Sequence, residues 1–493
     1  MIEPTLPSQL AGREPAGARL SATGAVLDEA FLTKLTATGA TISLEPHDLQ
    51  EHARDWWPIS VGWATRDLVG AFPGVVVTPS TSEQVASVLR LANEASIPVT
   101  PSAGRSGVNG GTIPLEGGVV LDLTALRSII EIDETSQLVT VEAGTFGPEL
   151  EAALRGTGEG YTLGHWPQSF DLSTVGGWLA CRGAGQLSTR YGKIEDMVRS
   201  LRVVLADGRE LRTASSGPRA AVGPDLNQLF VGSEGTFGVI TEATLVIHRA
   251  PSYQRRAAWG FASFDEAMEV CRRTLQRGAT PAVLRLYDAI ESERNFGITT
   301  NLLLALDEAD PLLVDACFTI LEHEATTGER LDDSLVDTWL AHRNNVSQLA
   351  PLWEAGIVVD TIEMAASWAA LPEARRRVLN ALSGVEGTLM ASVHQSHSYL
   401  DGACLYFTFA GQPEDSLAAQ EAYYRACWDG ASEAILSVGG ALSHHHGIGL
   451  NRSRFMAAAL GEGLDVLRRV KRSLDPRGIL NPGKLGLGEG DVW

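Results

Sequence analysis

Short apolar runs and amphipathic stretches alternate along the first half of the chain. Runs rich in β-branched residues and bounded by proline or glycine predict strands at 75–79, 97–101, 118–123, 137–145 and 238–250. Stretches in which apolar residues recur at helical spacing predict helices near 26–38, from residue 80 and over 147–158. An Asp-Gly pair at 207–208, flanked by apolar positions, predicts a hairpin over 201–212.

The helix expected from residue 80 has the clearest signals. Ser80 and Glu83 have the spacing of a capping box. The apolar stripe of this helix runs through Val85, Val88, Leu89 and Ala92. Because one strand precedes the helix and another follows it, we expect a strand–helix–strand unit, with the loop SAGRSGVNGG directly after the second strand.

The pattern changes after Pro251, where glycine becomes sparse and longer helices alternate with strands. Helices are expected at 263–278, from 311 and within 413–437, and strands at 282–288, 301–306 and 402–411. This predicts an α+β fold in which helices cover an antiparallel sheet. We expect an N-terminal arm (1–50), a domain of two α+β parts (51–250), a second domain (251–430) and a C-terminal segment (431–493) that returns to the first domain.

Composition narrows the class of protein. The 493 residues are 44% hydrophobic and 20% charged, which is typical of a globular chain. A formal net charge of -21 weighs against nucleic acid or an anionic membrane as a partner. No signal peptide and no run of about 18 apolar residues is found, so we expect no membrane span. The five cysteines form no CxxC pair, which favours free thiols and a cytoplasmic location.

Glycine-rich loops are the first sign of chemistry. The chain has 51 glycines, and three glycine-bearing loops occur at 101–107 (PSAGRSG), 167–185 and 232–241 (GSEGTFGVIT). Such loops present rows of backbone N–H groups that suit a pyrophosphate, although a single one is as readily a tight structural turn. Three of them in one block predict a large dinucleotide that lies across the domain. The familiar GxGxxG signature is absent.

These loops, taken in order with YGKIEDMV (191–198) and LDPRGILNPGKL (474–485), resemble the vanillyl-alcohol-oxidase type (PCMH-type) of FAD-binding flavoprotein. Within that superfamily the chain looks most like the alkyldihydroxyacetonephosphate synthase (alkylglycerone-phosphate synthase) branch, through STVGGW, LRLYD, GACLYF and LSHHHGIG. The resemblance implies a two-part PCMH-type FAD-binding domain, followed by a cap domain over the flavin ring.

The resemblance also implies which residues contact FAD. They are Pro101, Ser102, Ala103, Gly104, Arg105, Ser106, Gly107, Gln168, Ser169, Ser173, Thr174, Gly177, Ala180, Cys181, Arg182, Gly183, Glu234, Gly235, Thr236, Gly238, Val239 and Ile240. Relatives with covalently attached FAD carry a histidine just after the first glycine loop. Val108 stands there in this chain, so we expect FAD to bind non-covalently.

The histidines of SHHHGIG (443–449) leave three interpretations open: a metal site, a structural turn, or a cluster that acts as a base or anchors substrate. On a strand only His444 and His446 would share a face, and a metal needs further ligands. A metal-using sister branch oxidises D-2-hydroxy acids; His397 matches one of its ligands, but Tyr406 and His445 replace others. We therefore expect the base or anchoring cluster, and no metal.

The resemblance implies that His444, His445, His446 and Tyr406 take part in the chemistry, and that Arg285 lies in the active site. A neutral imidazole accepts a proton near pH 7, and a tyrosine hydroxyl relays one when a cation is near. A guanidinium group holds phosphate or carboxylate as a fork. The structural alternatives are a strand-edge salt bridge for Arg285 and a core-facing position for Tyr406.

Departures from the family pattern concern the substrate. Met364 and Ala365 replace hydroxyl residues, LNRSR (450–454) replaces a lysine-bearing stretch, and Arg343 is the one candidate for a second anion-binding arginine. These changes leave the cofactor prediction untouched. They weigh against a long-chain acyl dihydroxyacetone phosphate substrate.

Three functions are compatible with these residues. The first is a non-oxidative synthase-like flavoenzyme, in which a base removes a C–H proton and flavin N5 traps the substrate. The second is an oxidase or dehydrogenase that takes a hydride from a 2-hydroxy acid or an alcohol. The third is a flavin-binding protein without turnover. We expect the first, acting on a small-molecule substrate with an anionic group, and a homodimer as the assembly.

Overall fold

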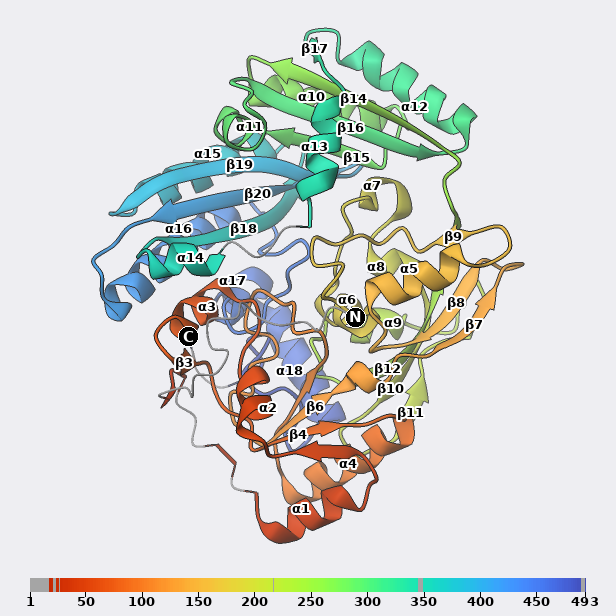
Figure 1. Ribbon diagram of the computed structural model, residues 1–493, viewed down its shortest axis with the longest axis vertical. Coiled ribbons are helices and arrows are strands. Elements are labelled where there is room, and N and C mark those ends of the chain that lie inside the picture. The colour runs from red at the N-terminus through yellow and green to blue at the C-terminus, as the bar shows by residue number, and fades with distance from the viewer. Residues whose placement is uncertain (1–16, 21–23, 26, 216, 345–348, 489–492) are drawn as a thin grey trace.

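Figure 1 shows an upper part built on one large sheet and a lower part built on two smaller sheets. The computed structural model describes residues 17–20, 24–25, 27–215, 217–344, 349–488 and 493. The predicted α+β class and the antiparallel sheet with its helices are confirmed. The predicted domain bounds stay predictions, and most of the expected N-terminal arm before residue 27 lies outside the described residues.

The first lower sheet has the order β2–β4–β6–β5, with β2 at Thr41–Ser43, β4 at Val75–Thr78, β6 at Val119–Asp122 and β5 at Val99–Ser102. Strands β4 and β5 both run parallel to β6. Helix α4 (Ser82–Ala95) connects β4 to β5, and the predicted apolar stripe is its buried face. The predicted cap was one residue too early: Thr81, in extended backbone, accepts from the backbone N–H of Gln84, whose side chain bonds back to Ser80.

The second lower sheet is antiparallel, with the order β11–β10–β12–β8–β7. Its strands are β11 (Glu210–Arg212), β10 (Val198–Val204), β12 (Val239–Val246), β8 (Leu138–Glu142) and β7 (Ile129–Asp133). The hairpin predicted at Asp207-Gly208 joins β10 to β11. The single strand predicted over 238–250 is wrong, because its end forms β13 (His248–Arg249), which leaves the sheet to pair with β9 (Tyr161–Thr162).

The upper sheet has seven strands, all antiparallel to their neighbours, in the order β17–β14–β16–β15–β19–β20–β18. They are β17 (Glu329–Leu331), β14 (Tyr253–Phe261), β16 (Asn301–Ala309), β15 (Val283–Tyr287), β19 (Thr388–Ser398), β20 (Gly402–Gly411) and β18 (Val358–Ser367). Helices α10 (Phe264–Gln276), α12 (Pro311–Glu324), α15 (Leu371–Ser383) and α16 (Leu417–Ser437) share one hydrophobic core with it. Helix α16 begins later than the predicted 413 because Ser416 caps it.

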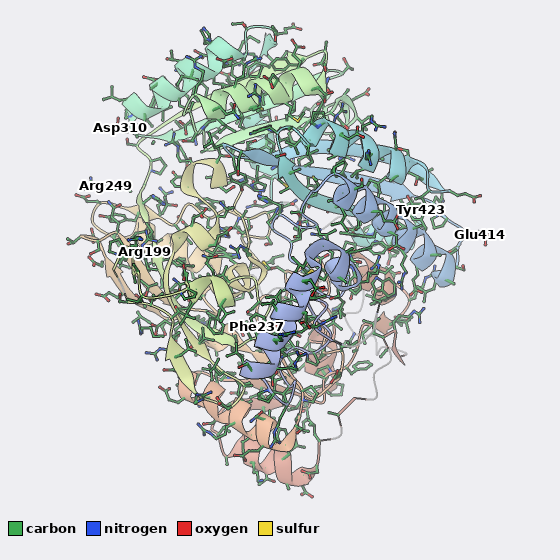
Figure 2. The ribbon with its side chains drawn as sticks, turned by 180° about the vertical axis from the view of Figure 1, so that it is seen from behind. Arg199, Phe237, Arg249, Asp310, Glu414 and Tyr423 are labelled. Carbon is green, nitrogen blue, oxygen red and sulfur yellow. The ribbon has the colours of Figure 1, made fainter. Side chains whose placement is uncertain are left out.

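The C-terminal residues lie against the lower part of the molecule. Helix α18 (Glu462–Leu474) adds Leu467, Val470 and Leu474 to the core cluster that contains Phe237 (Figure 2). Beyond it, Val99 on β5 exchanges backbone hydrogen bonds with Ile479 and Asn481. Ile479 and Leu480 pack in a second lower cluster with Phe31 and Leu35, so residues from near both ends of the chain share one core.

The remaining elements are short or connect these layers. They are β1 (Gly17–Ala18), α1 (Glu29–Thr36), α2 (Pro46–Glu51), α3 (Pro58–Ala64), β3 (Leu68–Val69), η2 (Leu123–Ala125), α5 (Gly147–Arg155), α6 (Val175–Cys181), α7 (Ser188–Tyr191), α8 (Ile194–Met197), α9 (Asn227–Phe230), α11 (Ala289–Phe296), α13 (Ser334–His342), α14 (Leu349–Glu354), η3 (Ser453–Phe455) and α17 (Met456–Leu460). No helix within the described ranges is long and apolar enough to cross a membrane.

Candidate active site

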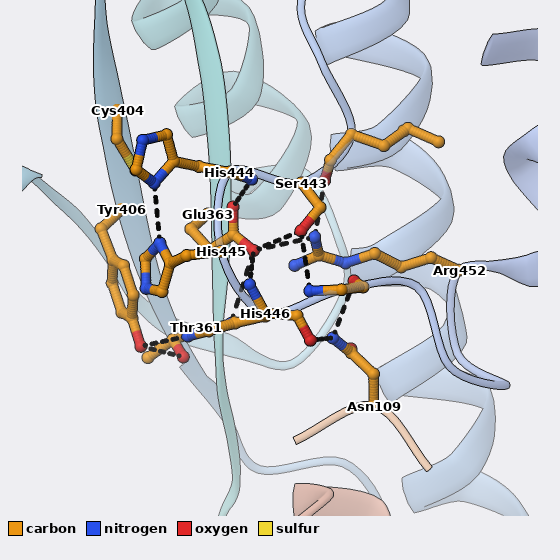
Figure 3. Close-up of polar contacts among 12 residues, drawn as sticks. Asn109, Thr361, Glu363, Cys404, Tyr406, Ser443, His444, His445, His446 and Arg452 are labelled. Carbon is orange, nitrogen blue, oxygen red and sulfur yellow. Dashed lines mark hydrogen bonds and ion pairs between the residues drawn. The ribbon is translucent and has the colours of Figure 1, made fainter. Parts of the chain in front are cut away.

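The histidine loop, residues 443–449, is held from the upper sheet by one buried carboxylate. Glu363 on β18 accepts hydrogen bonds from Ser443 Oγ at 2.8 Å, from the backbone N–H of His446 at 2.9 Å and from the backbone N–H of His444 (Figure 3). The same carboxylate forms an ion pair with Arg452, 2.9 Å away, and both side chains are fully buried. Burial opposes the charge on Glu363, but Arg452 and the adjacent imidazoles outweigh it and hold the pKa of Glu363 well below its usual range.

Tyr406 and His446 form an acid–base pair beside this carboxylate. The hydroxyl of Tyr406 lies 3.0 Å from Thr361 Oγ1 and 3.4 Å from Nε2 of His446. Burial raises the pKa of Tyr406 above its ordinary value and lowers the pKa of His446 to about 4. At neutral pH the phenol is therefore protonated and the imidazole is neutral. Tyr406 is half-buried while its neighbours Leu405 and Phe407 are fully buried, so the core-facing alternative for Tyr406 is not observed.

His444 and His445 lie in contact. Their Nδ1 atoms are 2.9 Å apart, and the ring of His397 stacks on His444 at a centroid distance of 4.8 Å. The alternation of side chains that a strand would impose does not apply, because 443–449 is a turn whose backbone N–H groups at His444 and His446 bond to Glu363.

Two further side chains join this histidine cluster. Tyr399 Oη lies 2.9 Å from Nε2 of His444 and 3.0 Å from Ser188 Oγ, and Ser188 Oγ lies 2.9 Å from Nδ1 of His397. Ser188 belongs to α7 in the lower part, whereas His397 ends β19 in the upper sheet. The cluster therefore spans the junction between the two parts.

The same cluster offers nitrogen atoms to a cation. One nitrogen each from His397, His444 and His445 lies within 4.8 Å of the other two, and Glu363, Cys404 and His445 form a second such group. Three imidazoles are a donor set that suits zinc. Both nitrogens of His444 and one of His397, however, are already hydrogen-bonded to protein groups. The absence of a metal stays a prediction.

Arg285 on β15 has a neutral partner. Its Nη2 lies 2.7 Å from Nε2 of His394, whose Nδ1 lies 2.8 Å from a carboxylate oxygen of Glu291. Burial opposes ionisation of Glu291, but His394 lowers the pKa of Glu291 to about 2, so the carboxylate accepts from Nδ1–H of His394. Nε2 then accepts from Arg285. The strand-edge salt bridge considered for Arg285 is not found among the described contacts, and its buried Nε has no partner there.

A second guanidinium group shares an aromatic neighbour with Arg285. Arg343 lies 5.5 Å and Arg285 5.8 Å from the ring centroid of Trp339 on α13, and Arg343 also lies 5.6 Å from the ring of Trp166. The sequence candidate for a second anion-binding arginine is thus placed near the first. Arginine on an aromatic face keeps its donors free for an anion.

The glycine loops meet the histidine loop. Glu234 accepts hydrogen bonds from the backbone N–H groups of Ile448 and Gly449 at 2.6 and 2.9 Å. Asn109 donates from Nδ2 to the carbonyl groups of His446 and Gly447, each at 3.1 Å. The loops that the sequence assigned to cofactor and to chemistry therefore form one assembly.

The loop at 101–107 has the features of a phosphate cradle. A Cβ at Gly104 would run into the carbonyl oxygen of Leu172, so this loop and the one after residue 167 approach more closely than any other residue allows. The backbone N–H groups of 104–108 donate to no acceptor among the described residues, and Ser102 Oγ is buried without a partner. Backbone donors without an acceptor in a closely packed glycine loop fit the pyrophosphate of a dinucleotide.

Several predicted FAD contacts also have structural partners. Ser173 accepts from the indole N–H of Trp178, and Thr174 caps α6. The guanidinium of Arg105 lies 2.9 Å from His52, and that of Arg182 bonds to Gln228. Val239 and Ile240 are buried on β12, and Thr236 bonds to the carbonyl of Ser233. Backbone groups of the glycine loops, more than these side chains, are left free for the cofactor.

The residues that position the site were not recognised in the sequence. They hold loops or rings in place and belong to no recognised chemical motif: Glu363, Asn109, Ser188, Tyr399 and His394. One signal was available: Thr361 and Glu363 are polar residues two apart on a largely apolar strand, which places both on one face. For Ser188 the sequence carried no comparable signal.

Comparison with known proteins agrees with this geometry. Residues 73–214 match the family described as FAD binding domain, and residues 250–485 match FAD linked oxidases, C-terminal domain. The chain is 29% identical over 491 residues to the alkyldihydroxyacetonephosphate synthase of Trypanosoma brucei brucei, covering 89% of this chain and 76% of that protein. It is 31% identical over 432 residues to the uncharacterized FAD-linked oxidoreductase YgcU of Escherichia coli (strain K12), covering 84% and 89%.

A third relative and one solved structure are also similar to this chain. The mitochondrial D-lactate dehydrogenase (cytochrome) of Arabidopsis thaliana is 30% identical over 436 residues, covering 84% of this chain and 73% of that protein. A solved alkyldihydroxyacetonephosphate synthase has the same fold, with a TM-score of 0.75, 24% identity, and coverage of 94% of this chain and 87% of that chain. With both family matches and the phosphate cradle in place, the chain belongs to the vanillyl-alcohol-oxidase (PCMH) type of FAD-linked oxidoreductases, and its cofactor is FAD.

Proposed function

We propose that this enzyme activates a C–H bond of a small substrate with an anionic or lipid-like character, in the manner of the alkyldihydroxyacetonephosphate synthases that it resembles. The observation that carries the proposal is that Tyr406 lies beside His445 and His446. The loop that holds these two histidines is hydrogen-bonded to the glycine loops through Glu234 and Asn109. When bound, FAD supplies an electron-accepting position, flavin N5, beside the activated carbon. Val108, at the position of the histidine in covalent relatives, supports non-covalent binding of FAD.

His445 is the proposed base. Burial lowers the pKa of His445 to about 3, so its imidazole is neutral at physiological pH. Its Nδ1 faces His444, and its Nε2 has no hydrogen-bond partner among the described residues. The ring lies beside that of Tyr406, with centroids 6.0 Å apart. A substrate C–H or O–H group between the two would meet one acceptor and one donor.

Tyr406 is the proposed partner for a substrate oxygen. Its O–H group is protonated, and Thr361 donates to it while His446 accepts from it. When a substrate oxygen develops negative charge, the single phenolic hydrogen can turn from His446 to that oxygen and donate to it.

Arg285 is the proposed anchor for the anionic group. Its partner is Nε2 of His394, which accepts through a lone pair because Nδ1 of the same ring carries the hydrogen. No carboxylate therefore cancels the guanidinium charge. Arg343, on the other side of the shared neighbour Trp339, supports a substrate with a phosphate or carboxylate. In a chain with a net charge of -21, such a local pair is needed to attract an anion.

A second candidate is the oxidation of a hydroxyl-bearing substrate such as a 2-hydroxy acid or an alcohol. It is favoured by the cap, where Met364 is fully buried in the core and Ala365 offers no hydroxyl, while Thr361 bonds to Tyr406 through its hydroxyl. The similarity to a D-lactate dehydrogenase points the same way. In this reaction His445 would take the hydroxyl proton, or Tyr406 would take it while passing its own proton to His446, and the bound FAD would accept the hydride from the carbon.

An anaerobic titration of the purified flavoprotein separates the two candidates. Acyl dihydroxyacetone phosphate, D-2-hydroxy acids and primary alcohols are added in turn, and the flavin spectrum is followed. A change with the acyl substrate that fatty alcohol restores without oxygen supports the synthase-like reaction. Full bleaching by a hydroxy acid or an alcohol contradicts it and establishes the oxidation. We further propose a cytoplasmic location, consistent with five free thiols, and a homodimer.

A further inference from the structure

We propose that His445 and His444 of the histidine loop begin a buried proton relay, His445–His444–Tyr399–Ser188–His397. Tyr399 and Ser188 are then positioning residues of the reaction. The inference rests on the proposed function, because it takes His445 as the group that faces the substrate. It adds three residues, Tyr399, Ser188 and His397, that lie outside the histidine triplet.

Every link of the relay is a short hydrogen bond. His445 Nδ1 lies 2.9 Å from His444 Nδ1, and His444 Nε2 lies 2.9 Å from Tyr399 Oη. Tyr399 Oη lies 3.0 Å from Ser188 Oγ, which lies 2.9 Å from Nδ1 of His397. All four separations are in the range of ordinary hydrogen bonds. Each of the three inner groups can donate to one neighbour and accept from the other.

The valence of these groups allows only two arrangements of the protons. In the first, Nδ1–H of His445 donates to His444, Nε2–H of His444 donates to Tyr399, Tyr399 donates to Ser188, and Ser188 donates to Nδ1 of His397. Nε2 of His445 then carries a lone pair and is a base. In the second, every bond points the other way and Nε2 of His445 carries a hydrogen and is an acid.

Passage of one proton converts the first arrangement into the second. A substrate C–H or O–H bond breaks, its electron pair stays on the substrate, and the proton forms a new bond to Nε2 of His445. Each relay hydrogen moves one bond along, and His397, which held one hydrogen on Nε2, gains a second on Nδ1 and becomes an imidazolium that holds the positive charge until the proton is returned. No electron is exchanged within the relay. His445 is left with a hydrogen on Nε2 that it can return in a later step.

The surroundings favour neutral rings between turnovers. Burial lowers the pKa of His444 and of His445 to about 3, and it lowers the pKa of His397 as well. Each imidazole therefore keeps one N–H and one lone pair, which the relay requires. Glu363 holds the backbone of the loop at His444 and His446, and so it fixes the rings without accepting the relayed proton.

The same residues raise the question of a metal. A cation bound by His397, His444 and His445 needs a lone pair on each, yet His444 spends both nitrogens on relay bonds. The hydrogen-bonded arrangement is the one that the present positions satisfy.

The first test reads the resting holoenzyme and needs no substrate. ¹⁵N-histidine NMR of the FAD-loaded protein reports which ring nitrogen of each histidine carries hydrogen. We expect single, opposed tautomers for His444 and His445, and loss of that order in Tyr399→Phe, with His165, a buried histidine outside the cluster, unchanged. Unchanged tautomers in Tyr399→Phe overturn the relay, whatever the substrate proves to be.

The second test uses whichever substrate the anaerobic titration identifies. Tyr399→Phe and Ser188→Ala should lower kcat about 10- to 100-fold, below the roughly 10²–10⁴-fold effect of losing an acid or base itself, with KM nearly unchanged and a larger solvent deuterium isotope effect. Tyr423→Phe, which removes a hydroxyl bonded to Thr388 away from the site, is the matched control. Equal kcat in all variants overturns the relay while leaving the proposed function intact.

Zn²⁺ titration of the holoenzyme, followed by the histidine NMR signals, distinguishes the relay from a metal site. Binding of one equivalent with loss of the His397, His444 and His445 signals would replace the relay by a metal site. Retention of those signals at excess Zn²⁺ supports the relay.

Discussion

At the scale of single residues, the buried carboxylate of Glu363 organises the site. It accepts from two backbone N–H groups and one hydroxyl of the histidine loop and pairs with Arg452, so four donors converge on one side chain. A buried charge is costly unless it is fully paired, and here the pairing is complete enough to keep it ionised. The position of the histidine loop therefore depends on the ion pair between Glu363 of the upper sheet and Arg452.

We expect Glu363→Gln to destabilise the protein by about 3–5 kcal/mol, because it leaves Arg452 buried without its counter-charge. Urea unfolding followed by circular dichroism measures the change, with the exposed Glu373→Gln as control. The folded pKa of Glu363 is depressed, so its contribution is present above the unfolded pKa and is lost as pH falls through the folded value. Equal stability of the two variants would contradict the role assigned to Glu363.

Asp360, three residues earlier, should act in the opposite direction. Burial raises the pKa of Asp360 to about 7, although Tyr424, the Thr361 N–H and Trp428 donate to it. The native protein then binds more protons than the unfolded chain, so stability falls as pH rises from about 4 toward 7. Asp360→Asn should flatten this fall. The check is the unfolding free energy at several pH values, and parallel curves for both proteins would count against the buried acid.

For chemistry, Tyr406→Phe and His445→Ala should each lower turnover by roughly 10²–10⁴-fold, the usual size of an acid–base contribution, and retain FAD. The phenol contacts His446 and the ring of His445, and neither group has a hydrogen bond or ring contact to the loop at 101–107 among the described residues. The flavin-to-protein absorbance ratio and kcat are measured together. Loss of flavin in either variant would contradict the role assigned to the substituted residue.

At the scale of elements, loops that follow strands carry the cofactor site. The loop after β5 and the loop before α6 meet at Gly104, where a side chain has no room. Sequence pattern located these loops because strand, glycine and helix signals stand side by side. It misplaced details that depend on hydrogen-bond partners, such as the α4 cap at Thr81 and the break between β12 and β13.

Gly104→Ala should abolish or strongly weaken FAD binding while the chain still folds. The new methyl group meets the carbonyl of Leu172 and pushes apart the two loops that form the cradle. Gly158→Ala, at a position with open space around it, is the control and should keep its flavin. Flavin content after purification and the shift in Tm on adding FAD give the answer. A yellow Gly104→Ala protein with normal flavin content would exclude the cradle.

At the scale of the whole molecule, the histidine cluster lies at a junction between two parts. Arg190 on α7 and Asp307 on β16 form a buried ion pair across it, with Nε of Arg190 at 2.6 Å from the carboxylate. Ser188 of the same helix enters the histidine cluster. The contacts that join the parts are thus the contacts that place Tyr399 and His397.

Arg190→Ala should cost about 3 kcal/mol or more, because Asp307 stays buried without its partner. We expect a lower Tm and a looser junction, seen as faster amide hydrogen exchange in α7 and β16. Arg209→Ala breaks an exposed pair with Asp207 and should change Tm very little. Similar Tm values for both variants would show that the junction does not rely on this pair.

The sequence by itself determined the local elements, the α+β class and the family, because these depend on periodicity and on glycine motifs that lie within short stretches. It also singled out Arg285, Tyr406 and the histidine triplet through their resemblance to family motifs. Their chemical roles stay predictions, since no neighbour of these residues can be read from the order of the chain.

Only the tertiary structure decided which groups meet. It brought Glu363 under the histidine loop, set His444 against His445 in a turn, gave Arg285 a neutral imidazole as its partner, and joined Ser188 to His397 across more than 200 positions. Hydrogen bonds and ion pairs act over about 3–4 Å in space, whatever the separation along the chain. Their partners are therefore fixed by how the strands and loops pack, and the pattern of single positions does not encode them.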